Sequence, residues 1–489
     1  MTMNIWKKLE ASFLANAPRP SITDQDGRSI TYHELLTMAR ETAMNLRSYV
    51  QARDRICMLH SHSYHDAVGI LSILAADCIG IPMSLNYGEN NCRQIIRRAA
   101  PAVLLTDLDP MPGEILGIVR EQNIEILSIT HEINTPFVEP KATEGDIALL
   151  MFTSGTTGVP KGAMLTHHNL IHNLDDIAAY FFLSENDHFL IARPLYHGAV
   201  MTGEFFHALL HGSKITFYSD PFSPKRLLAF LAANQCTVMC GTPTLFYHMA
   251  LNKRKTELPY LRKITVSGEC LNPEVADKLL EVFPHASFWN VYGLTEASPR
   301  VSHLDPEFFS LKIGSVGVPL NHVKAKVVND QGCEMPRNEI GELMIHGPNV
   351  MKGYWCEEEL TAQKIVDGWL YTGDLARMDE DGFIYIIGRK DDMIIRAGVN
   401  IYPQDIENSL LRDSAIKEVM VWGETAAVSG QRICAAVVPH DHSEMTAKRF
   451  LSICREHLEP YQWPDEMMLM EALPRNASGK IMRGRPNDG

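Results

Sequence analysis

The sequence has a deficit of positive charge and no apolar run long enough to span a membrane. It holds 45 Lys and Arg against 59 Asp and Glu, which gives a formal net charge of -14. Nucleic acids and anionic membranes attract basic surfaces, so this balance disfavours both as the main partner. The longest apolar run, about residues 67–83, contains Asp77 and is shorter than the ~18–20 residues that cross a bilayer. An anionic ligand would therefore need positive charge that is concentrated locally.

Cysteines at metal-binding or disulfide-framework spacing are also missing. The ten cysteines are scattered singly between Cys57 and Cys454, and no two-residue spacing recurs. The N-terminal stretch Met1–Pro20 carries Lys7 and Lys8, but Glu10 interrupts it, so we expect an opening helix and no secretory leader. Together these features predict reduced thiols and a cytoplasmic protein.

The length and the periodicity of the chain predict an α/β fold. The 489 residues, 45% of them hydrophobic, allow about three folded units. A turn at Asp24-Gln-Asp-Gly27 precedes a helical pattern over residues 32–49, which predicts a hairpin followed by a helix. Short β-rich runs then alternate with helical stretches up to about residue 291. This alternation is typical of parallel sheets covered by helices.

From Lys324 onward, short strands separated by glycine-rich turns predict a smaller β-rich subdomain. We therefore expect a large N-terminal domain at residues 1–388, with the β-rich subdomain at about 320–388. A small, mobile α+β C-terminal domain is expected at residues 389–489, after a linker at residues 389–392.

A candidate phosphate-binding loop, Thr153-Ser-Gly-Thr-Thr-Gly-Val-Pro-Lys161-Gly162, lies between a predicted strand and a helical stretch. It holds four hydroxyls, three glycines and one lysine in ten residues. Glycines let backbone N–H groups converge on phosphate oxygens, hydroxyls add donors, and Lys161 adds charge. The P-loop motif needs Gly-Lys before Ser or Thr, whereas Gly158 is followed by Val159-Pro160-Lys161. An ordinary Gly/Thr-rich turn is the alternative interpretation.

With four later segments, this loop resembles the signatures of the adenylate-forming (AMP-binding) enzymes, which include acyl-CoA synthetases, adenylation domains and luciferases. The later segments are Tyr292-Gly-Leu-Thr-Glu296, Tyr371-Thr-Gly-Asp374, Gly388-Arg389 with Asp391, and Pro474-Arg-Asn-Ala-Ser-Gly-Lys480. Each segment alone is a weak signal. The five occur in the family's order from Thr153 to Lys480, and that order makes the resemblance specific.

The resemblance implies an acid–thiol ligase that uses ATP, Mg2+ and coenzyme A. Such an enzyme joins a carboxylate to the α-phosphorus of ATP, expels pyrophosphate, and passes the acyl group to the thiol of coenzyme A. Glu296 would hold Mg2+, Thr295 would donate a hydrogen bond near the α-phosphate, and Lys480 would reach the reacting oxygens. The alternative is that neither residue is catalytic. Glu296 would then be a solvent-exposed carboxylate at the start of a helix, and Lys480 a lysine in a mobile C-terminal segment.

The implied ATP site draws on every signature. Asp374 would accept hydrogen bonds from the ribose hydroxyls, assisted by Arg389, although a turn-capping role for Asp374 is the alternative. Ser267 stands where many relatives have glycine. The full set implied is Thr153, Ser154, Gly155, Thr156, Thr157, Gly158, Lys161, Ser267, Gly268, Glu269, Asn290, Tyr292, Gly293, Asp374 and Arg389.

By the same resemblance, Asp391 would be the hinge about which the C-terminal domain rotates between the two half-reactions. One orientation would present Lys480 to the bound carboxylate. In the other, Ala397 and Gly398 would line a tunnel for the thiol acceptor. Many relatives have two glycines at this point, so Ala397 departs from the pattern.

The segment Arg193-Pro-Leu-Tyr-His197-Gly198 resembles the part of the family that lies beside the acyl pocket. His197 is the candidate gate, and Gly198, Ala199 and Met201 would line the pocket with Val200 and Phe205. Amino-acid-activating relatives place an aspartate near the start of this segment. Residues 196–202 contain no acidic residue, so we expect an aryl or aliphatic carboxylic acid that has no α-amino group.

Two other functions stay open at this point. The acyl group could pass to a separate carrier protein or to an amine instead of coenzyme A. A non-catalytic adenylate-binding sensor is the remote alternative, and such a protein would be expected to have lost Lys161, Glu296, Asp374 and Lys480.

Overall fold

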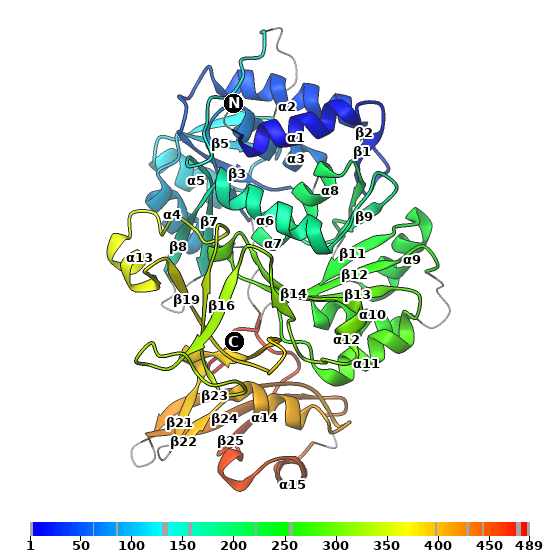
Figure 1. Cartoon of the computed structure of the whole chain (residues 1–489), viewed down its shortest axis with the longest axis vertical. Coiled ribbons are helices and arrows are strands. Elements are labelled where there is room, and N and C mark those ends of the chain that lie inside the picture. Colours follow the sequence, from blue (N-terminus) through cyan, green and yellow to red (C-terminus); the bar gives the residue numbers. More distant parts are fainter. Residues whose placement is uncertain are drawn as a thin grey trace. The chain divides into compact units, whose positions relative to one another are not determined.

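A computed structural model describes residues 3–486 except 62, 85–86, 130–134, 155–158, 221–222, 254–257, 397–398, 427–429, 443–444 and 476–480 (Figure 1). The chain divides into two compact units. Unit 1 comprises Met1–Ala325 and Ile345–Tyr371, and unit 2 comprises Lys326–Met344 and Thr372–Gly489. Residues 326–344 and 372–388 therefore group with the C-terminal part. The expected boundary of a moving domain near residue 388 stays a prediction.

The N-terminus forms the expected helix, hairpin and second helix. Helix α1 (Ile5–Ala15) begins at Asn4, whose side chain accepts a hydrogen bond from the Lys7 N–H over 3.0 Å. Strands β1 (Pro20–Thr23) and β2 (Ser29–Thr31) pair antiparallel. Helix α2 (Tyr32–Leu46) then begins with a capping box between Thr31 and Glu34, which satisfies the first free N–H groups of the helix.

A six-stranded sheet of unit 1 carries the candidate phosphate loop at one edge. Its order is β6-β5-β3-β4-β7-β8, and the strands are parallel except for the antiparallel hairpin β7–β8. The apolar run at residues 67–83 is a buried helix followed by a buried strand. The elements are β3 (Arg55–Leu59), α3 (Tyr64–Ala75), β4 (Ile79–Met83), α4 (Glu89–Ala99), β5 (Val103–Thr106), α5 (Gly113–Glu121), β6 (Glu125–Ser128), β7 (Ile147–Ser154) and β8 (Pro160–Thr166).

A nine-stranded sheet forms the rest of the unit 1 framework, in the order β15-β14-β13-β12-β11-β9-β10-β1-β2. Strands β1, β10, β9, β11, β12 and β13 run parallel, as the alternation of strands and helices predicted. The strands are β9 (His188–Ile191), β10 (Lys214–Phe217), β11 (Val238–Gly241), β12 (Lys263–Ser267), β13 (Ser287–Gly293), β14 (Arg300–Leu304) and β15 (Val318–Pro319).

The helices of this part include one π-helical segment that the sequence analysis did not predict. A single helical run covers residues 198–210 as α7 (Gly198–Val200), the π-helix η2 (Met201–Phe206) and α8 (His207–Leu210). The others are α6 (His167–Tyr180), α9 (Pro224–Asn234), α10 (Pro243–Asn252), α11 (Pro273–Val282), η3 (Thr295–Ala297), α12 (Pro306–Phe309) and α13 (Glu358–Lys364), the last followed by β18 (Ile365–Val366).

Unit 2 contains most of two five-stranded sheets. In the first, β16 (Lys324–Val328), β17 (Gly341–His346) and β19 (Trp369–Met378) lie in this order, and β20 (Ile384–Arg389) pairs with β19. The second has the order β22-β21-β24-β23 with β25 on β24, and its core packs against two helices. Its elements are η4 (Lys390–Asp392), β21 (Ile394–Arg396), β22 (Val399–Ile401), α14 (Pro403–Leu410), β23 (Ile416–Ala426), β24 (Gly430–Pro439), α15 (Ala447–His457), η5 (Pro460–Gln462) and β25 (Glu466–Leu469). The predicted α+β character of the C-terminal part is confirmed.

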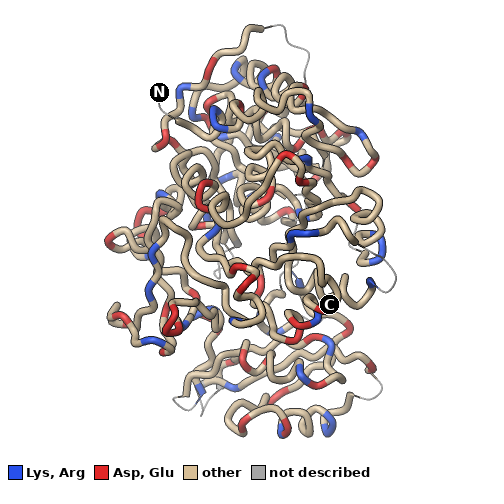
Figure 2. The backbone as a smooth tube through the Cα atoms, turned by 45° about the vertical axis from the view of Figure 1, so that its right-hand side comes forward, with Lys and Arg blue, Asp and Glu red and all other residues tan. Residues whose placement is uncertain are grey.

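The cysteines are free and most of them are buried, and charged residues of both signs are mixed along the chain. All ten cysteines are free, and seven are buried, while Cys270 is half-buried and Cys333 and Cys356 are exposed. Charged residues of both signs are interspersed along the described chain (Figure 2). Within the ranges that the structure describes, no helix combines the length and apolar character needed to cross a membrane.

Candidate active site

The hairpin β7–β8 holds the two ends of the candidate phosphate loop together. Thr153 on β7 lies directly opposite Lys161 on β8, and both side chains are half-buried. Ser154 lies opposite Pro160. Gly155, Thr156, Thr157 and Gly158 lie outside the described residues. The antiparallel ladder therefore puts the Lys161 and Thr153 side chains on the same face of the hairpin, at the base of the loop.

Residues 351–355 connect this hairpin to the second signature. The Met164 N–H of β8 donates to the Gly353 carbonyl over 2.9 Å, and the Trp355 N–H donates to the Gly162 carbonyl over 2.8 Å. From the same segment, the Met351 N–H donates to the Glu296 carbonyl over 2.9 Å. The Tyr354 hydroxyl donates to Oε1 of Glu296 over 2.8 Å. Lys161 and Glu296 are thus brought to the same part of unit 1 by one shared segment.

The second signature forms a tight turn at the end of β13. Gly293 ends the strand, and a Cβ at this position would overlap the Pro299 carbonyl, so only glycine fits. The 3-10 helix η3 follows and carries Thr295 and Glu296, both half-buried. Tyr354 orients one carboxylate oxygen of Glu296, and a half-buried carboxylate is the kind of donor that a hard cation prefers. This donor suits the Mg2+ that the sequence analysis assigned to it.

Strands β12 and β13 are parallel neighbours, and their carboxyl ends place the other nucleotide candidates at one edge of the sheet. Ser267 pairs with Val291 in register, and Gly268 follows with a φ of +94°, which favours glycine. Glu269 accepts a hydrogen bond from the Thr244 hydroxyl over 2.6 Å. Tyr292 is half-buried at the same end of β13.

Asn290 has a structural partner that the sequence did not indicate. Its Nδ2 donates to the Ser315 carbonyl over 2.7 Å, and the residue is 1% exposed. The amide donor is therefore used to hold the 315 loop against β13. A role for Asn290 in binding the adenine base stays a prediction.

The predicted acyl-pocket segment begins at His197, the residue that precedes α7. The His197 and Tyr196 rings lie 4.3 Å apart, and Tyr196 also meets the Tyr87 ring edge-on at 5.4 Å. A Cβ on Gly198 would lie 3.7 Å from the Met151 side chain of β7. Ala199 is half-buried, whereas Val200, Met201 and Phe205 are completely buried. The segment therefore carries aromatic rings at its start and apolar packing along its length.

A buried ion pair in this segment was not predicted from the sequence. Nη2 of Arg193 lies 2.5 Å from Oε1 of Glu204, which is 0% exposed. Burial raises the pKa of Glu204, and the neighbouring Arg193 opposes that rise. Glu204 lies only two residues beyond the 196–202 stretch that was inspected for acidic residues. A longer stretch would have found it, although its pairing with Arg193 depends on the fold.

Unit 2 carries its candidate residues on β19, β20 and η4. Asp374 lies opposite Arg389 in register, and Nη1 of Arg389 donates to Oδ1 of Asp374 over 2.9 Å. Lys390 pairs with Asp330 and Glu342 at 2.9 and 3.0 Å. Asp391 is exposed in η4. Ala397, Gly398 and Lys480 lie outside the described residues, so their predicted roles stay predictions.

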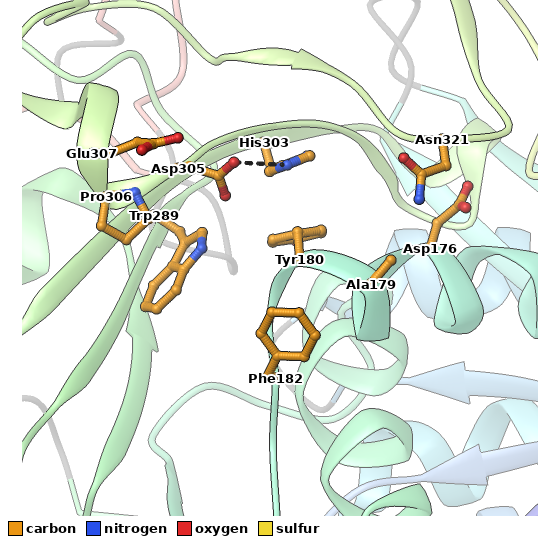
Figure 3. Close-up of a pocket in the computed structure, with 10 residues that line it drawn as sticks. All are labelled: Asp176, Ala179, Tyr180, Phe182, Trp289, His303, Asp305, Pro306, Glu307 and Asn321. Atoms are coloured by element: carbon orange, nitrogen blue, oxygen red, sulfur yellow. Dashed lines mark ion pairs between the residues drawn. The ribbon is translucent and has the colours of Figure 1, made fainter.

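A surface cavity of about 430 Å3 lies elsewhere in unit 1 (Figure 3). None of the residues predicted to bind ATP or acid lines it. On β13 the cavity is lined by Trp289, and because successive side chains of a strand point to opposite faces, Asn290 faces away from it. The lining residues are Asp176, Ala179, Tyr180, Phe182, Trp289, His303, Asp305, Pro306, Glu307 and Asn321.

Comparison with known proteins identifies two family matches. The AMP-binding enzyme family matches residues 9–355, and the AMP-binding enzyme C-terminal domain matches residues 405–480. The first match alone covers more than half of the chain and contains the phosphate loop and the second signature. The second match ends at Lys480.

Curated relatives and solved structures agree with these matches. A feruloyl-CoA synthase from Amycolatopsis sp is 30% identical over 96% of this chain and 95% of the relative. A long-chain-fatty-acid–CoA ligase from Bacillus subtilis is 30% identical over 94% of this chain and 90% of the relative. The ATP-bound structure of MatB from Rhodopseudomonas palustris superposes with a TM-score of 0.90 at 26% identity. The superposition covers 98% of this chain and 97% of MatB. The o-succinylbenzoate coenzyme A synthetase MenE from Bacillus subtilis, with ATP and magnesium ion, gives 0.88 at 26% identity, covering 98% of each chain.

Proposed function

The chain belongs to the AMP-binding enzyme family, and on that premise we propose that it activates a small carboxylic acid with ATP and transfers the acyl group to coenzyme A. The products are pyrophosphate, acyl-CoA and AMP, so the enzyme is an AMP-forming acid–thiol ligase. The observation that carries the proposal is the position of Glu296, whose carboxylate is oriented by Tyr354 while residues 351–355 also pair with the Lys161 hairpin.

In unit 1 the residues are suited to neutralising the phosphates of ATP. Glu296 would hold Mg2+, and the ion would supply positive charge to the phosphate oxygens when bound. Lys161 and the Thr153 hydroxyl would bind the polyphosphate at the base of the loop. Thr295, next to Glu296, would donate to the α-phosphate. Fixed donors that need not reorganise during the reaction stabilise the charge that develops there.

In unit 2 the candidate residues are suited to binding the ribose of ATP and to neutralising the negative charge of the reacting carboxylate and α-phosphate. Arg389 orients one oxygen of Asp374, and the carboxylate would accept hydrogen bonds from the ribose hydroxyls. Lys480 would approach the carboxylate and the α-phosphate during adenylation. Asp391 would serve as the hinge, and Ala397 with Gly398 would line the thiol path. These four roles rest on the signatures of the family.

The acid and the acceptor follow from the pocket segment and from the relatives. The 196–202 stretch lacks the aspartate that binds an α-amino group, which supports an aryl or aliphatic acid. The relatives are named CoA synthases and CoA ligases, which supports coenzyme A over a carrier protein or an amine. Ten free thiols support a reducing compartment, the cytoplasm.

The proposal is tested by acid-dependent release of pyrophosphate. Purified protein is supplied with ATP, Mg2+ and a panel of carboxylic acids, and the acyl products with coenzyme A, carrier protein or amine are identified by mass. We expect pyrophosphate with some acids and acyl-CoA as the product, and strong loss of both in Glu296→Gln. If well-folded protein releases no pyrophosphate with any acid, the proposed function is wrong. If the only product is an acylated carrier protein or an amide, the acceptor is that carrier protein or amine and not coenzyme A.

A further inference from the structure

Three charged side chains meet beside the predicted acyl-pocket segment in unit 1. Arg193 follows β9, Glu204 lies in η2, and Arg300 begins β14. Glu204 and Arg300 are 0% and 3% exposed, and the Arg193 side chain is 18% exposed. We call these three residues the charged cluster. Such groups are rarely buried, because removing a charge from water is costly unless it is paired.

The geometry places the charged cluster against the pocket face of the helical run. A Cβ on Gly203 would lie only 2.9 Å from Nη2 of Arg300, so the guanidinium packs on the bare backbone of that glycine. Gly203 follows Gly198 by five residues and Ala199 by four, and at this spacing all three share one face of the π-helical run. Arg193 in turn lies 3.5 Å from the Ser267 hydroxyl, at the edge of the sheet where the nucleotide candidates gather.

The charges of the cluster do not balance. Two guanidiniums face one carboxylate, which leaves a net charge of about +1 in a buried site. Burial raises the pKa of Cys240 to about 12 and lowers the pKa of His207 to about 3, so neither neighbour contributes charge at neutral pH. Burial raises the pKa of Tyr180 to about 12, so its phenol, which is hydrogen-bonded to Arg300, is neutral as well. Glu269, whose carboxylate accepts a hydrogen bond from the Thr244 hydroxyl, also faces Arg193 and offsets part of its charge, so the unbalanced positive charge lies at Arg300.

Polar atoms of the cluster are left without partners. Among the described residues, Nε of Arg193, Nε of Arg300 and Oε2 of Glu204 are buried and make no hydrogen bond. An unpaired buried polar group costs free energy, and a ligand that supplies its partner removes that cost on binding. Guanidinium groups only donate, and their planar fork matches a carboxylate. The two Nε donors therefore fit an anionic acceptor, whereas Oε2 of Glu204 does not.

We infer, building on the proposed function, that the acid substrate carries a second acidic group besides the reacting carboxyl, and that Arg300 and Arg193 bind it. The substrate class is a dicarboxylic acid. A simple fatty acid would bury its apolar tail against these arginines and leave their two Nε donors unpaired. Sites built to bind a polar group discriminate strongly against analogues that lack it. The helix glycine at position 203 provides the room in which Arg300 reaches this part of the pocket.

The test compares matched acids in the pyrophosphate assay. α,ω-Dicarboxylic acids of four to twelve carbons are compared with the monocarboxylic acids of the same length, and 4-carboxycinnamate is compared with cinnamate. We expect kcat/KM for the preferred dicarboxylic acid to exceed that of its monocarboxylic partner by about 100-fold or more. Pyrophosphate release that is equal or faster with the monocarboxylic acids overturns this inference and leaves the proposed function standing. No release with any acid overturns the proposed function itself.

Variants separate recognition from a structural role. In Arg300→Met we expect the ratio of kcat/KM for the two acids of a matched pair to fall by about 10-fold or more, while Arg300→Lys, which keeps the charge, restores part of it. A structural defect would lower kcat/KM for both acids in parallel and leave their ratio unchanged. That result would contradict binding of the second acidic group by Arg300. Should Arg300→Met fail to fold, the comparison of matched acids in the unaltered protein still decides the inference.

Discussion

Asp374 and Arg389 occupy directly opposed positions on neighbouring antiparallel strands, and the guanidinium of Arg389 donates a hydrogen bond of 2.9 Å to the Asp374 carboxylate. Asp374 is 6% exposed, and its own N–H donates to the Thr372 hydroxyl over 3.1 Å. Arg389 therefore orients the carboxylate, and Thr372 fixes the main chain that carries it. A carboxylate that is held in this way loses little conformational freedom when it binds a ligand.

Replacing Asp374 should weaken nucleotide binding through the sugar. In Asp374→Ala we expect the KM for ATP to rise about 10- to 100-fold, because two charge-assisted hydrogen bonds to ribose hydroxyls would be lost. The measurement is steady-state kinetics with ATP and with 2′-deoxy-ATP, which should differ less in the variant than in the unaltered protein. Asp381→Asn, in the turn after β19, is the matched control. An unchanged ATP preference over the deoxy analogue in Asp374→Ala would contradict the assignment.

Tyr354 should tune the metal site without being required for it. Hydrogen bonds to charged groups contribute about 1.5–3 kcal/mol, so Tyr354→Phe should raise the Mg2+ concentration for half-maximal rate by about 10-fold. Glu296→Gln should instead lower kcat by about 100-fold or more. The check is a Mg2+ titration of pyrophosphate release, with Tyr461→Phe, a half-exposed tyrosine of unit 2, as the control. If Tyr354→Phe titrates like the control, Tyr354 does not orient the metal ligand.

Lys480 should matter for one half-reaction only. We expect Lys480→Ala to slow adenylation about 100-fold or more while thioester formation from supplied acyl-adenylate is little affected, because the ammonium would stabilise charge only while the carboxylate attacks ATP. The exposed Lys448→Ala is the control. Equal losses in both half-reactions would argue against domain alternation about Asp391.

His167 should make unit 1 less stable in mild acid. Its Nδ1 accepts the Ile5 N–H over 3.3 Å, which requires the neutral ring, and burial lowers its pKa to about 4. The unfolded chain, with a pKa near 6.5, therefore binds more protons between pH 6.5 and 4, so the free energy of unfolding falls as the pH falls through this window and is fully recovered above it. The loss reaches about 3 kcal/mol at most.

Denaturant unfolding measured at several pH values from 7.5 to 4.5 checks this expectation. His167→Gln should show a shallower dependence on pH than the unaltered protein, whereas His285→Gln, which changes an exposed histidine, should keep the original slope. His188 and His207, whose pKa values burial lowers to about 4 and about 3, contribute in the same direction and remain in both variants. Identical slopes in the two variants would show that His167 does not titrate on unfolding.

The sequence predicted those parts of the fold whose signals are local. The turn at residues 24–27 and the helical pattern over 32–49 predicted a hairpin followed by a helix, and the structure has β1, β2 and α2 there. The docking of β1 beside β10 joins segments nearly two hundred residues apart and leaves no local pattern. Register and pairing across such separations depend on tertiary packing, which no window of the sequence contains.

The candidate site likewise contains residues with a local sequence signal and residues that only the fold brings together. Glu296, Asp374 and Arg389 became candidates because their signatures are contiguous, and their roles stay predictions. Tyr354 was missed because its contact with Glu296 spans 58 residues and its own segment carries no recognisable motif. The charged cluster was missed because a π-helix shifts which side chains share a face. Arg300 reaches the helical run only because residue 203 has no side chain.

The burial of the cysteines has a practical consequence for measuring the reaction. Burial raises the pKa of Cys236 and Cys240 to about 12, so these thiols are protonated and react slowly, whereas Cys333 and Cys356 are exposed. A colorimetric thiol reagent added to the native enzyme should therefore label two groups quickly and Cys270 more slowly. Consumption of coenzyme A can then be followed above a small, constant background, and a rise toward ten reactive groups reports unfolding during the assay.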